Sequence, residues 1–198
     1  HSDAMDLAKM LAVLELIEPL QGPDFRIWKQ TRTGLLSYPL DPAAARAHLA
    51  ASVYVQMALK PHIIHVVGHT EADHAATAED VIEACRLARR AIDNALRGAP
   101  DMTADPAVQA RKEQIKAEVE LILQAIRGLA PGSADPLADP AALARAVAVG
   151  IMDAPQLRNN RFARGAVQTR IHNGASIAVD SQGRPLAEDI RLANLKMD

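Results

Sequence analysis

Histidines and carboxylates gather in one short part of the chain, between Lys60 and Asp80. They are His62, His65, His69, Glu71, Asp73 and His74. Imidazole nitrogens and carboxylate oxygens bind zinc and other transition metals, and His69, Asp73 and His74 could together hold one ion. Their spacing matches no recognised metal motif such as His-Glu-x-x-His. A metal-dependent α/β hydrolase is therefore one interpretation of this segment.

Two other interpretations of the same residues stay open. The histidines could simply be satisfied by the backbone and by water. Alternatively, the segment could hydrogen-bond an organic ligand through Glu71 and His69. Residues 62–67 form a short β-branched run that stops at Gly68, so His69 and Glu71 fall in the loop after the carboxyl end of a predicted strand. In parallel α/β folds, ligands bind at such loops.

Alternating helix and strand signals predict an α/β fold. A helix is expected at residues 5–18, a strand at 25–33, a helix at 42–59 and a strand at 62–67. Helices at 77–97, 106–127 and 140–149 follow, each with a capping signal at its start. Asn173-Gly174 between two alternating runs predicts a terminal β-hairpin. The strand–helix–strand–helix passage predicts parallel strands with right-handed crossovers.

Length, charge and cysteine content limit the classes of function. The 198 residues are enough for one domain with a sizeable core. The net charge of −2 gives no basic excess for nucleic acid. No apolar run approaches the roughly 20 residues that a membrane helix needs. Cys85 is the single cysteine, which excludes an internal disulfide and is typical of a cytoplasmic protein.

Weaker candidates lie near the first predicted strand. Tyr38 follows that strand, again at a carboxyl end, so it is a possible pocket residue. Arg26, Lys29 and Arg32 would bind a phosphate only if they faced one pocket together with four arginines of a predicted helix, Arg86, Arg89, Arg90 and Arg97. The sequence contains no P-loop, no Gly-x-Gly-x-x-Gly and no Gly-x-Ser-x-Gly motif.

A series of short motifs runs through the chain in a recognisable order. VGHTEA begins at Val67, GIMDAP begins at Gly150 after two long helices, and FARG begins at Phe162. Arg170 lies in the first strand of the predicted hairpin. In this order the series resembles the carboxyl-terminal third of the large catalytic (epsilon) subunit of glutamate mutase, also called methylaspartate mutase. The resemblance extends from the first helix to about residue 189.

The resemblance implies a fold. The family has a (β/α)8 TIM-type barrel, and this chain would supply its last units with a helical and β-hairpin carboxyl-terminal extension. Residues 1–100 would form the carboxyl-terminal βα units, and residues 101–198 the helical segment and terminal hairpin of the same domain. The chain is therefore expected to be a fragment, or one chain of a split enzyme.

The resemblance also implies an activity. The chain would be part of an isomerase, a radical carbon-skeleton mutase that interconverts glutamate and 3-methylaspartate or a related substrate. The cofactor would be adenosylcobalamin, shared with a small cobalamin-binding subunit or domain. The other partners would be the remaining barrel segment and a small amino-acid substrate. In the family the substrate-binding arginines come from earlier barrel strands, so no catalytic residue is assigned here.

Within the family, a lysine and a glutamate of one strand-end loop contact the adenosyl ribose. The glutamate matches Glu71, whereas Val67 stands at the lysine position. The expected cofactor-binding residues are therefore Glu71, His69 and Gly68, with no metal site. The loss of the lysine favours one alternative, a non-catalytic binding or assembly module derived from such a barrel.

Overall fold

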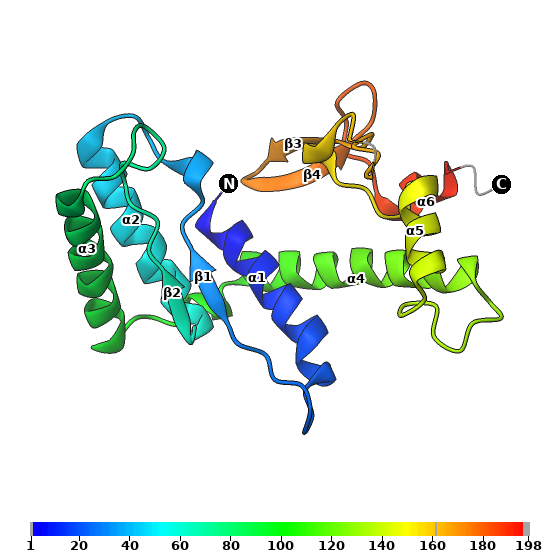
Figure 1. The fold of residues 1–198 in the computed structure, drawn as a ribbon, viewed down its shortest axis with the longest axis horizontal. Helices are drawn as coiled ribbons and strands as arrows, with labels where there is room; N and C mark the ends of the chain where they lie inside the picture. Colours follow the sequence, from blue (N-terminus) through cyan, green and yellow to red (C-terminus); the bar gives the residue numbers. More distant parts are fainter. Residues whose placement is uncertain (1, 161, 196–198) are drawn as a thin grey trace. The chain divides into compact units, whose positions relative to one another are not determined.

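The computed structural model describes residues 2–160 and 162–195 of the chain (Figure 1). Internal contacts divide the chain into two units, Asp3–Ala110 and a second one made of Arg111–Asp198 with His1–Ser2. Helices and small sheets occur in both units, which is compatible with the predicted α/β class. None of the helices among the described residues is both long and apolar enough to cross a membrane.

The unit Asp3–Ala110 alternates helices with two short strands. Its elements are α1 (Asp3–Ile17), η1 (Glu18–Leu20), β1 (Gln30–Arg32), η2 (Leu35–Ser37), α2 (Pro42–Gln56), η3 (Met57–Leu59), β2 (Ile63–His65), α3 (Ala78–Leu96) and η4 (Met102–Ala104), where η marks a 3₁₀ helix. At the start of α2 the Asp41 side chain accepts a hydrogen bond from the backbone N–H of Ala44. At the start of α3, Thr77 and Asp80 form a capping box. Both starts agree with the capping signals in the sequence.

The two strands of this unit pair in parallel, as the helix between them predicts. Gln30 lies opposite Ile63, and Arg32 lies opposite His65. Both strands are shorter than predicted, because the pairing begins only where the Lys29 carbonyl accepts the backbone N–H groups of His62 and Ile63 at 2.9 and 3.1 Å. Residues 25–29 have no strand beside them within the described residues and stay irregular.

Helices α2 and α3 lie side by side and cover one face of this sheet (Figure 1). The core between them contains Leu49, Val53, Ala84, Ala88 and Ala91, with Ile64 and Val66 packed against it. Small alanines on α3 allow the two helices to approach closely. The opposite face of the sheet is bare, since all four side chains that point there are exposed: Gln30, Arg32, Ile63 and His65.

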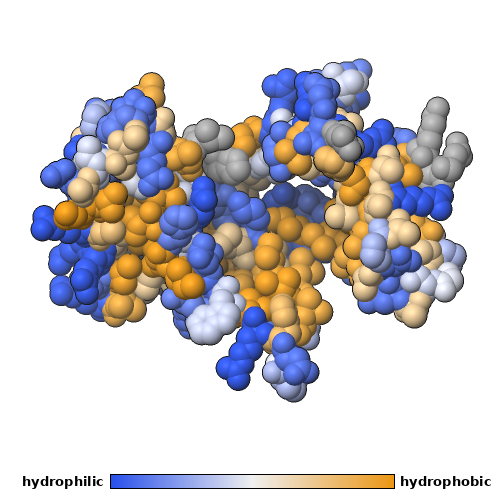
Figure 2. Space-filling model, in the orientation of Figure 1, coloured by the Kyte–Doolittle hydropathy of each residue, from blue (hydrophilic) through white to orange (hydrophobic). Residues whose placement is uncertain are grey.

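A second cluster anchors α1 in the same unit. Leu7 and Ala8 of α1 are buried against Leu59 and Val108. The other side of α1 carries apolar residues without cover: Val13 is 48% exposed, and Figure 2 shows hydrophobic surface over this helix.

The second unit is built from most of one long helix and a hairpin. Its elements are α4 (Pro106–Leu129, which begins in the first unit), α5 (Pro140–Val149), η5 (Pro155–Leu157), β3 (Gln168–His172), β4 (Ala175–Val179) and α6 (Glu188–Ala193). The core contains Ile126, Ala146 and Ile151. Strands β3 and β4 pair antiparallel across Asn173 and Gly174, which both have positive φ, so the predicted hairpin is confirmed. Helix α6 carries no side-chain cap and is not predicted from the sequence.

Candidate functional site

The loop after β2 folds into a tight turn around Gly68 and Glu71. The backbone N–H of Glu71 donates to the Gly68 carbonyl at 3.1 Å. In return, the Gly68 N–H donates to Oε1 of the Glu71 carboxylate at 2.5 Å. A Cβ atom at position 68 would lie 3.1 Å from Oε1, so glycine allows this close approach. Gly68 is buried and Glu71 is exposed, so the turn presents a carboxylate to solvent at the carboxyl end of the strand.

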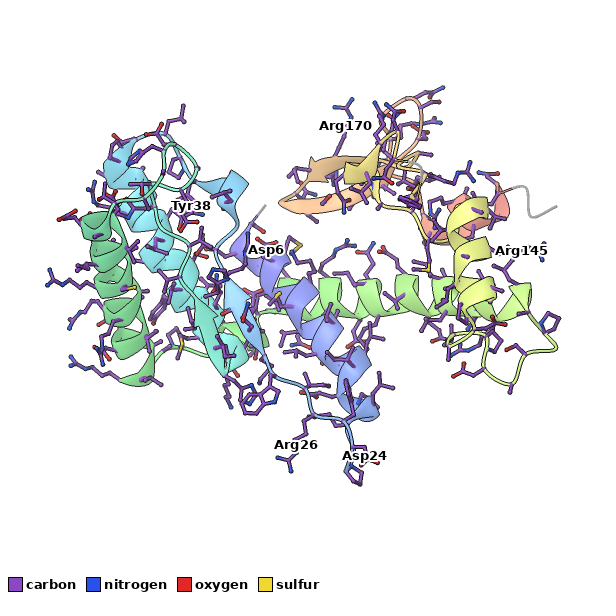
Figure 3. All side chains as sticks on the ribbon, in the orientation of Figure 1. Asp6, Asp24, Arg26, Tyr38, Arg145 and Arg170 are labelled. Atoms are coloured by element: carbon purple, nitrogen blue, oxygen red, sulfur yellow. The ribbon has the colours of Figure 1, made fainter. Side chains whose placement is uncertain are left out.

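Tyr38 ties the loop after β1 to this turn. Its hydroxyl donates to the Val67 carbonyl at 2.7 Å, and Figure 3 shows the ring between the two strand-end loops. Burial raises the pKa of Tyr38 to about 12; the negative charge of Glu71 adds to this shift, and a hydrogen bond with Thr33 opposes it. The phenol is therefore a neutral donor at all physiological pH values. Tyr38 holds the backbone beside Glu71.

His69 points away from solvent and toward α3. Its side chain is 1% exposed, and Nε2 lies 3.4 Å from Oε2 of Glu83. The two atoms are within ion-pair distance, but their alignment does not meet hydrogen-bond geometry. Arg46 of α2 donates to both oxygens of Glu83, from Nε at 2.8 Å and from Nη2 at 3.1 Å. These two bonds lower the pKa of Glu83 and raise that of Arg46.

The far end of the same loop is also attached to α3. Nδ1 of His74 lies 2.9 Å from the Asp73 carboxylate, and Nε2 lies 3.6 Å from that of Asp80. The hydrogen bond with Asp73 is the main cause of a raised pKa for His74. The backbone N–H of Thr77 is the main cause of a lowered pKa for Asp80. The loop is therefore held at both ends, with Glu71 exposed between the contacts.

The structure does not bring the three proposed metal ligands together. His69 is buried against Glu83, whereas Asp73 and His74 form an exposed pair. Among the described residues, no three histidine, cysteine or carboxylate side chains are arranged to hold a metal ion.

The three candidate phosphate-binding cations near the first strand do not share a pocket either. Nζ of Lys29 donates to the Leu59 carbonyl at 2.8 Å. Arg32 lies on the bare face of the sheet beside His65. Figure 3 shows Arg26 on the segment before β1, far along the unit from Tyr38.

Glu83 and Arg46 are the two residues of this site that sequence reasoning missed. They lie on different helices, 37 positions apart, so no local spacing connects them. The available signal was weak: Glu83 follows the capping box by one turn, and so lies close to the loop.

The GIMDAP and FARG motifs have structural contacts in the second unit. Asp153 accepts hydrogen bonds from the backbone N–H groups of Gly165, Ala166 and Val167 at 2.6 to 2.9 Å. Nη1 of Arg164 donates to the Val149 carbonyl at 2.6 Å. A cavity of about 350 Å³ adjoins these residues, but its carboxylate and guanidinium groups already have protein partners. Neither motif presents a free catalytic group.

The protein-family model described as methylaspartate mutase E chain (MutE) matches residues 24–196. This match includes both strand-end loops, the two motifs above and the terminal hairpin, and it confirms the resemblance seen in the sequence. A search of curated proteins finds none that matches the chain.

Proposed function

We propose, since this chain belongs to the methylaspartate mutase E chain family, that it is part of an adenosylcobalamin-dependent carbon-skeleton mutase. Its substrate would be glutamate and 3-methylaspartate or a closely related pair. The observation that carries this proposal is the turn of Gly68 and Glu71, which directs a carboxylate to solvent at the carboxyl end of a parallel strand. That end is where enzymes built on parallel α/β folds bind their ligands.

The sheet of the first unit supports the assignment of this unit to a (β/α)8 barrel. β1, α2, β2 and α3 make two consecutive βα units, with parallel strands and both helices on one face. A barrel covers the outer face of its strands with helices and closes the inner face with other strands. Two strands cannot close such a wall, and Ile63 on the bare face is 48% exposed. We therefore propose that further strands complete the barrel.

Glu71 fits one of the two ribose contacts that the family uses. Oε1 is oriented by the Gly68 N–H, and Oε2 has no hydrogen bond with any described residue. An ionised carboxylate accepts only, so Oε2 would accept a hydrogen bond from a ribose hydroxyl. When bound, adenosylcobalamin would supply the radical chemistry of the rearrangement. The residues of this chain would bind and orient its ribose.

The second ribose contact of the family has no equivalent at the same position. Val67 is 3% exposed and carries no cation. Its carbonyl is used by the Tyr38 hydroxyl. We propose that Glu71 acts without a neighbouring ammonium group, with Gly68 as its positioning donor. The valine in place of the family lysine favours the second candidate function, a binding or assembly module without catalysis.

The remaining partners follow from the family. We propose that a small cobalamin-binding subunit docks on this chain. The groups that bind the amino-acid substrate would come from the other barrel strands. On this proposal the chain alone does not isomerise glutamate.

The test compares Glu71→Gln with Glu79→Gln in the full chain, each assembled with the remaining barrel segment, the cobalamin-binding subunit and adenosylcobalamin. Glu79 is exposed in the first turn of α3 and provides a matched control. A lost hydrogen bond to a charged group predicts about tenfold to a hundredfold weaker cofactor binding for Glu71→Gln, and wild-type binding for Glu79→Gln. Affinity and cob(II)alamin formation are the measurements.

Two outcomes would count against the proposal. Equal affinities for wild type and Glu71→Gln would remove Glu71 from the cofactor site. No cob(II)alamin and no isomerisation in the complete wild-type assembly would support the non-catalytic module instead.

A further inference from the structure

The imidazole of His69 is buried without a well-formed hydrogen bond. The residue is 5% exposed, and neither ring nitrogen has a partner with hydrogen-bond geometry among the described residues. The Glu83 carboxylate lies 3.4 Å from Nε2. A buried polar group without a partner is costly. The direction of the ring toward Glu83 therefore needs an explanation.

Glu83 is a fixed and ionised neighbour. Arg46 binds both of its oxygens, and Nη1 of Arg46 also donates to the Pro42 carbonyl at 3.3 Å. The pKa of Glu83 is lowered mainly by Arg46, against smaller opposing effects of burial and of Asp80. A carboxylate only accepts hydrogen bonds, so the ring nitrogen facing it must carry a proton. The other nitrogen, Nδ1, has no hydrogen-bond partner among the described residues, so Nε2 is the ring nitrogen placed to donate to the protein.

His69 lies inside the turn that presents Glu71. The turn is closed by the two hydrogen bonds between Gly68 and Glu71, and His69 is one of the two residues between them. On one side the backbone is held at Val67 by Tyr38. On the other side His69 is the contact with α3. Fixing this ring therefore fixes the direction of the Glu71 carboxylate.

We propose that His69 is a positioning residue. Its Nε2 lies within ion-pair distance of the Glu83 carboxylate, and Arg46 holds that carboxylate in place. The chain of Arg46, Glu83 and His69 keeps the turn of Gly68 and Glu71 on α3, ready for a ligand hydroxyl. This inference rests on the proposed ligand-binding role of Glu71.

The first test needs no cofactor, because the Gly68 amide proton reports on the turn. In the full chain, amide exchange at Gly68 is expected to be about tenfold faster in Glu83→Gln and in His69→Leu, since each removes one modest contact. A glutamine at position 83 has one accepting oxygen in place of two, so at least one of the three contacts with Arg46 and His69 is lost. Glu79→Gln is the matched control and is expected to leave Gly68 unchanged.

A conservative variant separates positioning from packing. His69→Gln places an amide N–H close to where Nε2 lies and is expected to restore slow exchange at Gly68, whereas His69→Leu keeps the bulk without the donor. Nitrogen-15 spectra of the wild-type histidines are expected to show His69 protonated at Nε2, with the signal shifted in Glu83→Gln. Equal exchange at Gly68 in all four variants, or a ring protonated at Nδ1, would overturn the inference.

The second test links the contact to ligand binding in the complete assembly. Glu83→Gln is expected to weaken adenosylcobalamin binding in the wild-type background and to add no further loss in the Glu71→Gln background. If Glu71→Gln weakens binding but Glu83→Gln and His69→Leu do not, the positioning role is wrong and the proposed function stands. If the exchange results hold but Glu71→Gln binds normally, the proposed function fails and the turn is held by His69 for another reason.

Discussion

Asp153 shows how a single side chain can organise a loop. One carboxylate accepts three successive backbone N–H groups, from Gly165, Ala166 and Val167. These groups belong to the segment that leads into β3, so Asp153 holds the backbone just before the hairpin. Its place in the GIMDAP motif is explained by this contact without any catalytic role.

The substitution Asp153→Asn tests that explanation. An amide has one accepting oxygen, so at least one of the three bonds is lost, and the free energy of unfolding is expected to fall by about 1.5–3 kcal/mol. Thermal unfolding of the full chain measures the change. Asp93→Asn, at an exposed position of α3, is expected to leave the midpoint within experimental error. An equally stable Asp153→Asn variant would contradict the structural role.

At the scale of single residues, the sequence predicts placement better than contact. Gly68, His69 and Glu71 follow a strand because a β-branched run ends at a glycine, and that much is visible in the sequence. The approach of His69 to Glu83 is not visible in the sequence, because it depends on the direction in which α3 returns across the sheet. The role of Glu71, His69 and Gly68 in cofactor binding stays a prediction.

The loop between β2 and α3 behaves as an element in its own right. His69 attaches its first half to Glu83, and His74 attaches its second half to Asp73 and Asp80. Backbone turns support the second half, since Asp73 and His74 both donate to the Thr70 carbonyl at 2.9 Å. The second attachment depends on charge, because it pairs an imidazole with carboxylates.

This attachment predicts a pH dependence of the loop. His74 has a pKa raised above 6.5, so its charged contacts stabilise the loop fully below pH 6.5 and are lost as the pH rises through the raised value. Asp80 has a pKa lowered below 3.8, so its contribution is present above pH 3.8 and is lost as the pH falls through the lowered value. The loop is therefore expected to be most ordered in mildly acidic solution.

Amide exchange at Asp73 and His74, corrected for the intrinsic effect of pH, measures this order. Exchange is expected to accelerate on the alkaline side of the His74 titration. In His74→Ala the faster exchange at high pH should disappear. The faster exchange at low pH, which comes from protonation of Asp80, should remain. An unchanged profile in that variant would show that His74 does not hold the loop.

Among the elements, the helices with capping signals at their ends were predictable, α1 was predictable from its apolar periodicity, and α6 was not predictable. α2 and α3 begin at their capping residues, and the hairpin turns at Asn173-Gly174, because these signals act locally. α6 has no such signal, and its Arg191 donates to the carbonyls of Gly150 and Ile151, far away in the sequence, at 2.7 and 2.9 Å. The strands shortened because their length depends on a partner strand and not on their own residues.

For the molecule as a whole, the sequence predicted one domain with segments at 1–100 and 101–198. The contacts form two units that divide between Ala110 and Arg111, within α4. Each unit has its own buried cluster, around Leu49 and Val53 in the first and Ile126 and Ile151 in the second. The periodicity of α4 cannot reveal such a division, because a helix keeps its pattern when its neighbours change. The barrel stays a proposal that rests on family membership and on the bare face of the first sheet.

Matched core variants test whether the two units unfold separately. Leu49 is 0% exposed and Ile151 is 1% exposed, so replacing either with alanine is expected to cost about 2–5 kcal/mol. If the units are separate cooperative regions, Leu49→Ala accelerates amide exchange in α2 and α3 but not in α5 and β4, and Ile151→Ala does the reverse. Equal acceleration throughout the chain in both variants would show one cooperative fold. Separate responses would mean that the loop carrying Glu71 depends for its stability on the first unit alone, so substitutions in the hairpin would leave ligand binding at Glu71 unchanged.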